Sequence, residues 1–310
     1  MSTLVASLSI QPFTQFRRSK HFYLWYDGFY AALCVLALAG MRRAGWQGLT
    51  AEWSPKLFLW LPLVCHIQIL CSVWIHNCTH GNFPRAVNRL VGEVCGLVVM
   101  TRYASWEILH QRHHKYSDDP ILDPHPVIPG YTGYWRFLWR GFVAVEQQLQ
   151  QMYFELYGGK SEENVAYQRY RATLSFGTMV LLAMVWYLAL GAPVFVMLFL
   201  PATVIGVLHL MHFNWSTHNP WSKTADFRPV NLDHGFYWLG NRIWHGIYYH
   251  GNHHQKSGLF NPMTMDPAKA LPVIRPGDTT DHYPRKKTKG RAPGQLVLDP
   301  LEDEAEDAAA

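Results

Sequence analysis

The sequence is short of charged residues and of paired cysteines. Asp, Glu, Lys and Arg make up 16% of its 310 residues, whereas a soluble domain usually carries about 25%. This shortage argues against a disordered chain and against a nucleic-acid-binding module. The five cysteines are an odd number and form no CxxC pair, so we expect neither a disulfide scaffold nor a structural zinc site. We expect them to be reduced and to act as small hydrophobic side chains.

Hydrophobic residues, at 49% of the chain, gather in four long runs. The runs cover residues 22–41, 57–75, 174–190 and 193–210, and none of them contains Lys or Arg. Because about 20 apolar residues cross the roughly 30 Å of membrane hydrocarbon, we predict an all-α membrane protein with four transmembrane helices. The short links at residues 42–56 and 191–192 predict that these helices form two hairpins.

The basic residues predict how the chain is oriented in the membrane. Apart from those in the first link, Lys and Arg lie before, between and after the two hairpins. The positive-inside rule therefore predicts that both termini and the long middle segment are cytoplasmic. Within that segment, residues 131–157 mix aromatic side chains with arginine, which predicts a helix in the membrane interface. A soluble helix packed on the cytoplasmic part has the same pattern and stays open. We predict a membrane domain over 1–276 and a mobile cytoplasmic tail over 277–310, which is basic and then acidic.

Histidine is abundant, with 17 residues, and eight of them fall into three clusters. Residues three and four apart share one face of a helix, so each cluster can direct imidazoles at one point. This arrangement predicts metal binding by a helical cytoplasmic cap. The clusters are His76 and His80; His110, His113 and His114; and His250, His253 and His254.

The donor set narrows the choice of metal. Zinc sites close with four ligands, so eight imidazoles indicate two ions. Asn77 replaces the glutamate of a zinc-protease HExxH motif, and haem needs only one or two axial ligands. Imidazole suits iron, copper and zinc, and iron fits a membrane enzyme that activates oxygen.

The motifs HxxxH, HxxHH and HxxHH, in this order around two hairpins, resemble those of the integral-membrane fatty acid desaturase superfamily. The resemblance covers residues 22–266 and includes an NxxxH element formed by Asn214 and His218. It implies a histidine-rich dimetal site with two Fe2+ ions, and Asn214 as a ligand through a water molecule. The implied direct iron ligands are His76, His80, His110, His113, His114, His218, His250, His253 and His254, with no catalytic residue separate from this set.

Imidazole ligands often donate their second N–H to a carboxylate. The candidates for this role near the second cluster are Glu107, Asp118, Asp119 and Asp123. Four further histidines lie near the motifs but outside them, and we predict structural or supporting roles for these: His209, His212, His234 and His245.

The resemblance implies an O2-dependent oxidoreductase that introduces a C=C bond into a fatty acyl chain, carried by a lipid, a thioester or a free acid. It also implies a separate electron donor, such as a ferredoxin or cytochrome b5 with its reductase. Decarboxylases that make terminal alkenes, hydroxylases and carotenoid ketolases share the same motifs and stay open. A different class, a non-catalytic membrane metal-binding protein or transporter, needs polar residues along the spans, and there only His66 and Asp27 stand out.

Overall fold

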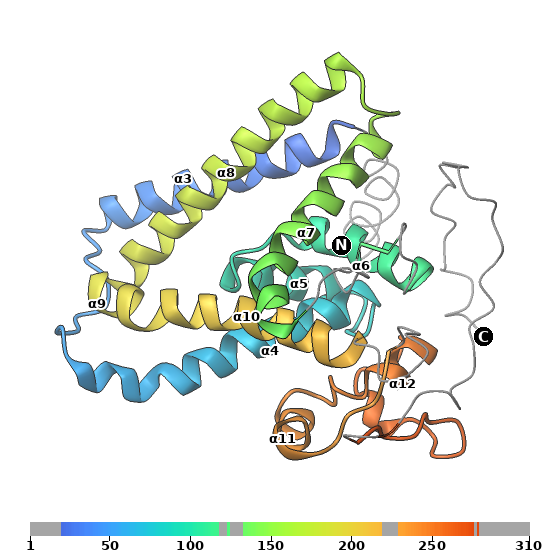
Figure 1. Ribbon diagram of the computed structural model, residues 1–310. Helices are drawn as coiled ribbons and strands as arrows, with labels where there is room; N and C mark the ends of the chain where they lie inside the picture. The colour runs from blue at the N-terminus through green and yellow to red at the C-terminus, as the bar shows by residue number, and fades with distance from the viewer. Residues whose placement is uncertain (1–19, 118–122, 125–132, 219–228, 276–277, 279–310) are drawn as a thin grey trace. The chain divides into compact units, whose positions relative to one another are not determined.

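The computed structural model describes residues 20–117, 123–124, 133–218, 229–275 and 278. Helices dominate these residues, and their only extended pairings are isolated bridges from Asn231 to Tyr249 and Val273 (Figure 1). The chain divides into two units, Met1–Ser216 and Thr217–Ala310, which are described separately below. The predicted all-α class is confirmed.

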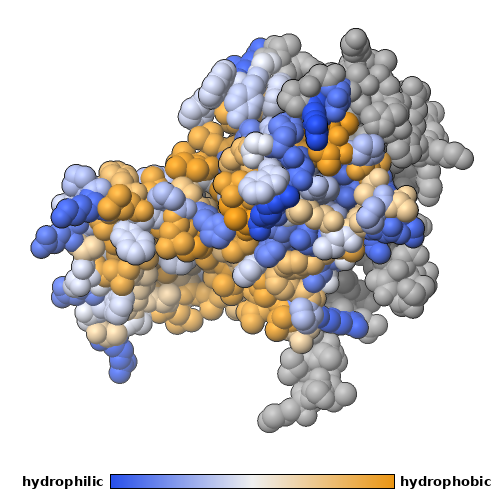
Figure 2. Space-filling view, turned by 90° about the horizontal axis from the view of Figure 1, so that it is seen from below, coloured by the Kyte–Doolittle hydropathy of each residue, from blue (hydrophilic) through white to orange (hydrophobic). Residues whose placement is uncertain are grey.

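Four helical segments are long and apolar enough to cross a membrane. The first is α3 (Phe22–Arg43), and the second joins the 3-10 helix η1 (Pro55–Trp60) to α4 (Leu61–Thr79). The third is α8 (Glu162–Leu190), and the fourth is the series α9 (Ala192–Val194), π-helical η2 (Phe195–Phe199) and α10 (Leu200–His218). On the face seen in Figure 2, hydrophobic residues form a broad band with hydrophilic residues beyond one end.

The third segment is longer than its apolar run. Helix α8 begins at Glu162, well before the predicted span starts at residue 174. The Ser161 hydroxyl caps it by accepting a hydrogen bond from the Asn164 N–H at 3.2 Å, and Glu162 and Glu163 favour the positive end of the helix dipole. The helix ends at Gly191, whose φ of +75° suits glycine.

A helix of the first predicted hairpin packs against a helix of the second. Helix α3 packs mainly against α8, and the two run side by side in Figure 1. The connecting links also meet, because the Trp46 Nε1–H donates to the Ala189 carbonyl at 3.3 Å. A Cβ atom on Gly191 would lie 2.8 Å from the Leu49 carbonyl oxygen, so this approach requires glycine.

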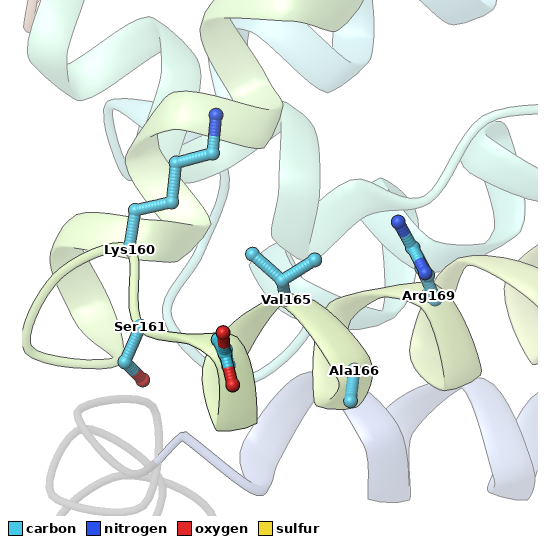
Figure 3. A pocket seen from close by; sticks show the side chains of 6 residues that line it. Lys160, Ser161, Val165, Ala166 and Arg169 are labelled. Atoms are coloured by element: carbon cyan, nitrogen blue, oxygen red, sulfur yellow. The ribbon is translucent and has the colours of Figure 1, made fainter.

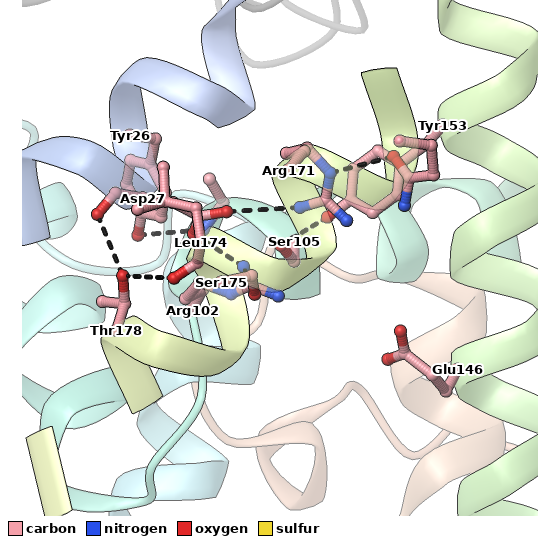
Figure 4. A network of polar contacts seen from close by, with 12 residues as sticks. Tyr26, Asp27, Arg102, Ser105, Glu146, Tyr153, Arg171, Leu174, Ser175 and Thr178 are labelled. Carbon is pink, nitrogen blue, oxygen red and sulfur yellow. Dashed lines mark hydrogen bonds and ion pairs between the residues drawn. The ribbon is translucent and has the colours of Figure 1, made fainter. Parts of the chain in front are cut away.

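A buried polar network ties these spans to the middle segment (Figure 4). Asp27 of α3 is fully buried and accepts from Arg102 at 2.6 Å and from Arg171 of α8 at 3.3 Å. Arg171 also lies 3.9 Å above the Tyr153 ring. Arg102 donates to Ser175 as well and occupies the N-cap position of α6 (Tyr103–Tyr116). The network therefore fixes the start of α6.

The remaining helices of the first unit are α5 (Asn88–Val98), which packs against α4, and α7 (Tyr134–Leu156). Helix α7 lies where the sequence predicts an interfacial helix. The second unit holds α11 (Gly235–Ile243), α12 (His250–Gln255) and η3 (Pro262–Thr264). The predicted tail, apart from Asp278, lies outside the described residues.

Candidate metal centre

Two helices of the first unit bring five of the predicted ligands together. His76 lies in the last turn of α4, and His80 is the residue that ends this helix. His110, His113 and His114 occupy the second half of α6. The start of α6 is anchored by Arg102, so the buried ion pair with Asp27 and the histidines lie at opposite ends of one rigid helix.

The imidazoles of this cluster converge closely. The Nε2 atoms of His80 and His110 are 2.8 Å apart, and the ring centroids of His76 and His110 are 4.4 Å apart. The His114 ring lies 4.6 Å from that of His110. The nearest ligand atoms of His76, His80, His110 and His114 all lie within 4.8 Å of one another, so one ion can reach all four.

The surroundings keep this cluster neutral. Burial lowers the pKa of His80 to about 4. Burial, reinforced by the neighbouring His76, His114 and His80, holds the pKa of His110 well below its usual range. Both imidazoles are therefore uncharged at pH 7, which leaves a nitrogen lone pair on each for a metal ion.

His113 has a carboxylate partner. Its Nδ1 lies 2.8 Å from Oδ1 of Asp123, and both side chains are buried. A carboxylate accepts here, so the proton is held on Nδ1 and Nε2 carries the lone pair that can bind a metal ion. Of the other candidate carboxylates, Glu107 lies 3.9 Å from Arg89, and Asp118 and Asp119 lie outside the described residues.

The second unit gathers the other four predicted histidines. His218, at the end of α10, and His250, at the start of α12, have Nε2 atoms 2.9 Å apart. The Nε2 of His254 lies 3.0 Å from that of His250. The ring of His253 stacks on that of His250, with centroids 5.4 Å apart. His218, His250 and His253 are almost completely buried.

Two asparagines that sequence reasoning missed hold the third cluster in place. Asn252, between its histidines, accepts from Asn231 at 2.8 Å and from the Leu271 N–H at 2.8 Å. Its own N–H donates to the Asn231 side chain at 3.0 Å. A Cβ atom on Gly251 would lie 2.9 Å from Leu271 and 3.1 Å from Asn231. The Gly-Asn pair inside the motif thus has a packing role, and the only signal for it in the sequence is its place between ligands.

The remaining predicted residues lie apart from these contacts. Asn214 is buried in α10. The four histidines predicted to be structural have protein contacts of their own: His212 bonds Tyr134 at 2.9 Å, His209 lies near His212, His234 packs on Tyr237, and His245 packs on Phe260. A hollow at the start of α8 contains no histidine (Figure 3) and is lined by Lys160, Ser161, Glu162, Val165, Ala166 and Arg169.

The geometry of each cluster fits a metal ion. The closest imidazole pairs are separated by 2.8 Å in the first unit and by 2.9 and 3.0 Å in the second. Imidazole ligands suit iron, copper or zinc, so the clusters are consistent with a metal site.

Comparisons with known proteins place this arrangement in a family. The family model for fatty acid desaturases matches residues 51–259, a range that contains all nine predicted histidine ligands. An sn-1 oleoyl-lipid 12-desaturase of Arthrospira platensis is 31% identical over 102 residues, which are 31% of this chain and 28% of that protein. A protein of the same name from Picosynechococcus sp. (strain ATCC 27264 / PCC 7002 / PR-6) is 41% identical over 46 residues, 14% of this chain and 13% of the relative. No solved structure matches the chain.

Proposed function

Because the chain belongs to the fatty acid desaturase family, we propose that it is an O2-dependent membrane oxidoreductase that introduces a C=C double bond into a fatty acyl chain. The observation that carries this proposal is the family match across residues 51–259, which spans the three histidine motifs and the NxxxH element. The four apolar helices and the family make it a multi-pass integral membrane protein.

The metal centre of this proposal contains two iron ions. The proposed ligands, as the resemblance to the family implies, are His76, His80, His110, His113, His114, His218, His250, His253 and His254. Asn214 adds a ligand through water. Iron with O2 supplies the oxidising power for removing hydrogen from an unactivated methylene, which side-chain acids and bases lack.

The protein's own groups prepare and hold this shell. Asp123 holds the His113 proton on Nδ1, so that Nε2 is presented for binding. Asn252 and Asn231 fix the backbone of α12, from which three histidines project. Because every supporting side chain named here is buried, the ligands are positioned before substrate arrives, which limits reorganisation during the reaction.

The overall reaction of the proposal is balanced as follows. Two vicinal C–H bonds of the acyl chain break and a C=C bond forms, while O2 is reduced to two molecules of water. The acyl chain supplies two electrons and two protons. The remaining two electrons come from an external donor, and the remaining two protons come from solvent. We propose a ferredoxin or cytochrome b5 with its reductase as that donor. The basic residues outside the hairpins favour a cytoplasmic site.

Oxidative decarboxylation to a terminal alkene is the alternative within the family. It requires a cation that holds the substrate carboxylate. Arg112, beside the second motif, donates to both carboxylate oxygens of Glu155. Arg242 pairs with Asp233 at 2.7 Å, and Lys115 is exposed. The two arginines are thus already paired within the protein, which favours desaturation.

A non-catalytic metal transporter is the alternative from a different class. Such a protein requires polar groups along its spans. Asp27, the acid in the apolar runs, is bound by two arginines and anchors α6. This structural role for Asp27 supports the enzymatic proposal over transport.

The test is lipid analysis of cells that express the protein and receive a deuterated saturated fatty acid. We expect an unsaturated product with the carbon count unchanged, and none from a His253→Ala variant expressed at the same level. The same cells should be tested with and without a ferredoxin or cytochrome b5 system. A product one carbon shorter, or a hydroxylated chain as the sole product, would contradict desaturation but leave the metal site standing.

A further inference from the structure

Helix α11 of the second unit buries small and polar residues and exposes large apolar ones, the reverse of the usual pattern in a water-soluble helix. Its buried residues are the small or polar Gly240 and Asn241. A Cβ atom on Gly240 would lie 2.7 Å from the Tyr248 ring, and the Asn241 amide donates to the Leu232 carbonyl at 2.8 Å. The contacts of Gly240 and Asn241 therefore point inward, where they hold the helix against its own unit.

The opposite side of α11 is apolar and exposed. Phe236, Leu239 and Ile243 follow one another at spacings of three and four residues, and so share one face of the helix. Phe236, Trp238 and Leu239 are each 50% exposed, and Ile243 is 39% exposed. We call Phe236, Trp238, Leu239 and Ile243 the α11 apolar face. Such a face is unfavourable in water and marks a contact surface.

The edge of this face carries the pattern of a membrane interface. The Arg242 guanidinium lies 4.2 Å from the Trp238 ring centroid and donates to Asp233 at 2.7 Å. Tryptophan paired with arginine is favoured where hydrocarbon meets headgroups, since one part is apolar and the other stays hydrated. An acidic protein partner is less suited to this face, because the Arg242 guanidinium beside it is already bound to Asp233.

Helix α7 of the first unit repeats the pattern independently. Trp135, Trp139 and Phe142 lie on one side of this helix and are 73%, 70% and 54% exposed. Arg136 and Arg140 flank them in the sequence. The first unit contains the membrane spans, so an exposed aromatic stripe beside arginine already occurs in a unit that contacts lipid.

We propose that the α11 apolar face lies in the headgroup–hydrocarbon boundary of the bilayer, with the helix parallel to the membrane plane. Phe236, Leu239 and Ile243 enter the acyl region, and Trp238 and Arg242 stay at the headgroups. Since α12 follows α11 after six residues, this contact holds the third histidine cluster at the membrane surface. The inference rests on membrane insertion and not on the reaction that the protein catalyses.

The test uses the full-length protein in phosphatidylcholine nanodiscs and a thiol-reactive bimane label. The label is placed at Leu239→Cys and, as a second reading of the same face, at Ile243→Cys. Lys269→Cys, exposed and polar in the same unit, is the aqueous control, and Phe142→Cys on α7 gives a second helix for comparison. The unsubstituted protein measures labelling of the five native cysteines.

We expect lipids brominated near the headgroup to quench the label at residues 239 and 243 at least about two-fold more than at 269, since only these positions enter the bilayer. Aqueous iodide should give the reverse order. Quenching by iodide at 239 and 243 equal to that at 269 would show a face open to water and overturn the proposal. Protection from both quenchers would show that protein covers the face, from this chain or a second copy, and would overturn it as well.

Discussion

Asp123 makes the clearest single-residue contribution to the candidate metal centre. It is buried, and its carboxylate lies 2.8 Å from Nδ1 of His113. Carboxylate partners of this kind orient the ring and increase its basicity, and removing them typically costs about 10–100-fold in metal affinity.

We therefore expect Asp123→Asn to lower iron affinity by about 10–100-fold while the protein still inserts into the membrane. Iron retention during titration with a chelator measures the effect. Asp266→Asn is the matched control, because Asp266 is exposed and its carboxylate accepts from the local N–H of Ala268 at 3.0 Å. Equal iron retention by the two variants would contradict the role given to Asp123.

At this scale the sequence predicted the clustering well, because helical spacing alone aligns His110 with His113 and His114. It could not choose among Glu107, Asp118, Asp119 and Asp123, since that choice depends on how the chain turns after α6. Asn231 and Asn252 were missed for a similar reason. Their mutual hydrogen bonds join positions that are distant in the sequence, and no local pattern records such a pair.

At the scale of elements, the turn between α5 and α6 sets the direction of the helix that bears the second motif. The Thr101 N–H donates to the Gly96 carbonyl at 2.9 Å, and Met100 has a φ of +56°. A Cβ atom on Gly96 would lie 2.8 Å from the Thr101 carbonyl oxygen, so the backbone itself would have to move.

We expect Gly96→Ala to destabilise the protein by about 1–3 kcal/mol through this clash and to lower its iron content. The control is Gly177→Ala in α8, where a Cβ atom meets nothing within 4 Å. That change should be neutral or should stabilise the helix by about 0.5–1 kcal/mol. Thermal unfolding in detergent measures both, and an unaffected Gly96→Ala protein would show that the turn is not rigid.

The ion pair between Asp27 and Arg102 anchors the other side of the same turn. Removing one partner of a buried pair leaves an uncompensated charge and typically costs about 3–5 kcal/mol. We expect Asp27→Asn to lower thermal stability markedly and to reduce iron content, because α6 loses its anchor.

Glu163→Gln is the control for this change, since its ion pair with Lys20 is exposed and such pairs contribute about 0–1 kcal/mol. If the Asp27→Asn protein unfolds as close to the wild-type temperature as the Glu163→Gln protein does, the anchoring role of Asp27 is contradicted.

The existence of the four long helices followed directly from apolar run length, but their ends and partners did not. Helix α8 begins at Glu162 because Ser161 caps it, whereas hydropathy detects only the part after residue 174. The pairing of α3 with α8 includes the contact between Asp27 and Arg171, which joins residues of different predicted hairpins. Periodicity within one helix carries no information on such a contact.

On the scale of the whole molecule, composition separates the membrane domain from its tail. Residues after Gly290 have few apolar anchors and many acids, so we expect them to be dispensable. Truncation after Lys289 should leave iron content and activity within a few-fold of the full-length values. Loss of iron on truncation would show that the domain extends further than the predicted boundary at residue 276.

The class of the whole molecule was predictable because two strong signals agree. Four apolar runs predict a membrane protein, and the structure has four helices long and apolar enough to cross a membrane. The three histidine motifs predict a metal centre, and they lie within the residues that match the fatty acid desaturase family. The substrate, the electron donor and the position of the double bond were not predictable, because they depend on shape and surface, which motif spacing does not record.

We propose that nine histidines hold two irons, and metal analysis of the purified full-length protein is the direct test. Iron per chain should be determined by mass spectrometry for the wild type and for His76→Ala, His110→Ala and His253→Ala variants, with membrane insertion verified for each. We expect close to two irons per wild-type chain and a clear loss of iron in every variant. One zinc per wild-type chain, or full iron content in the His253→Ala protein, would contradict it.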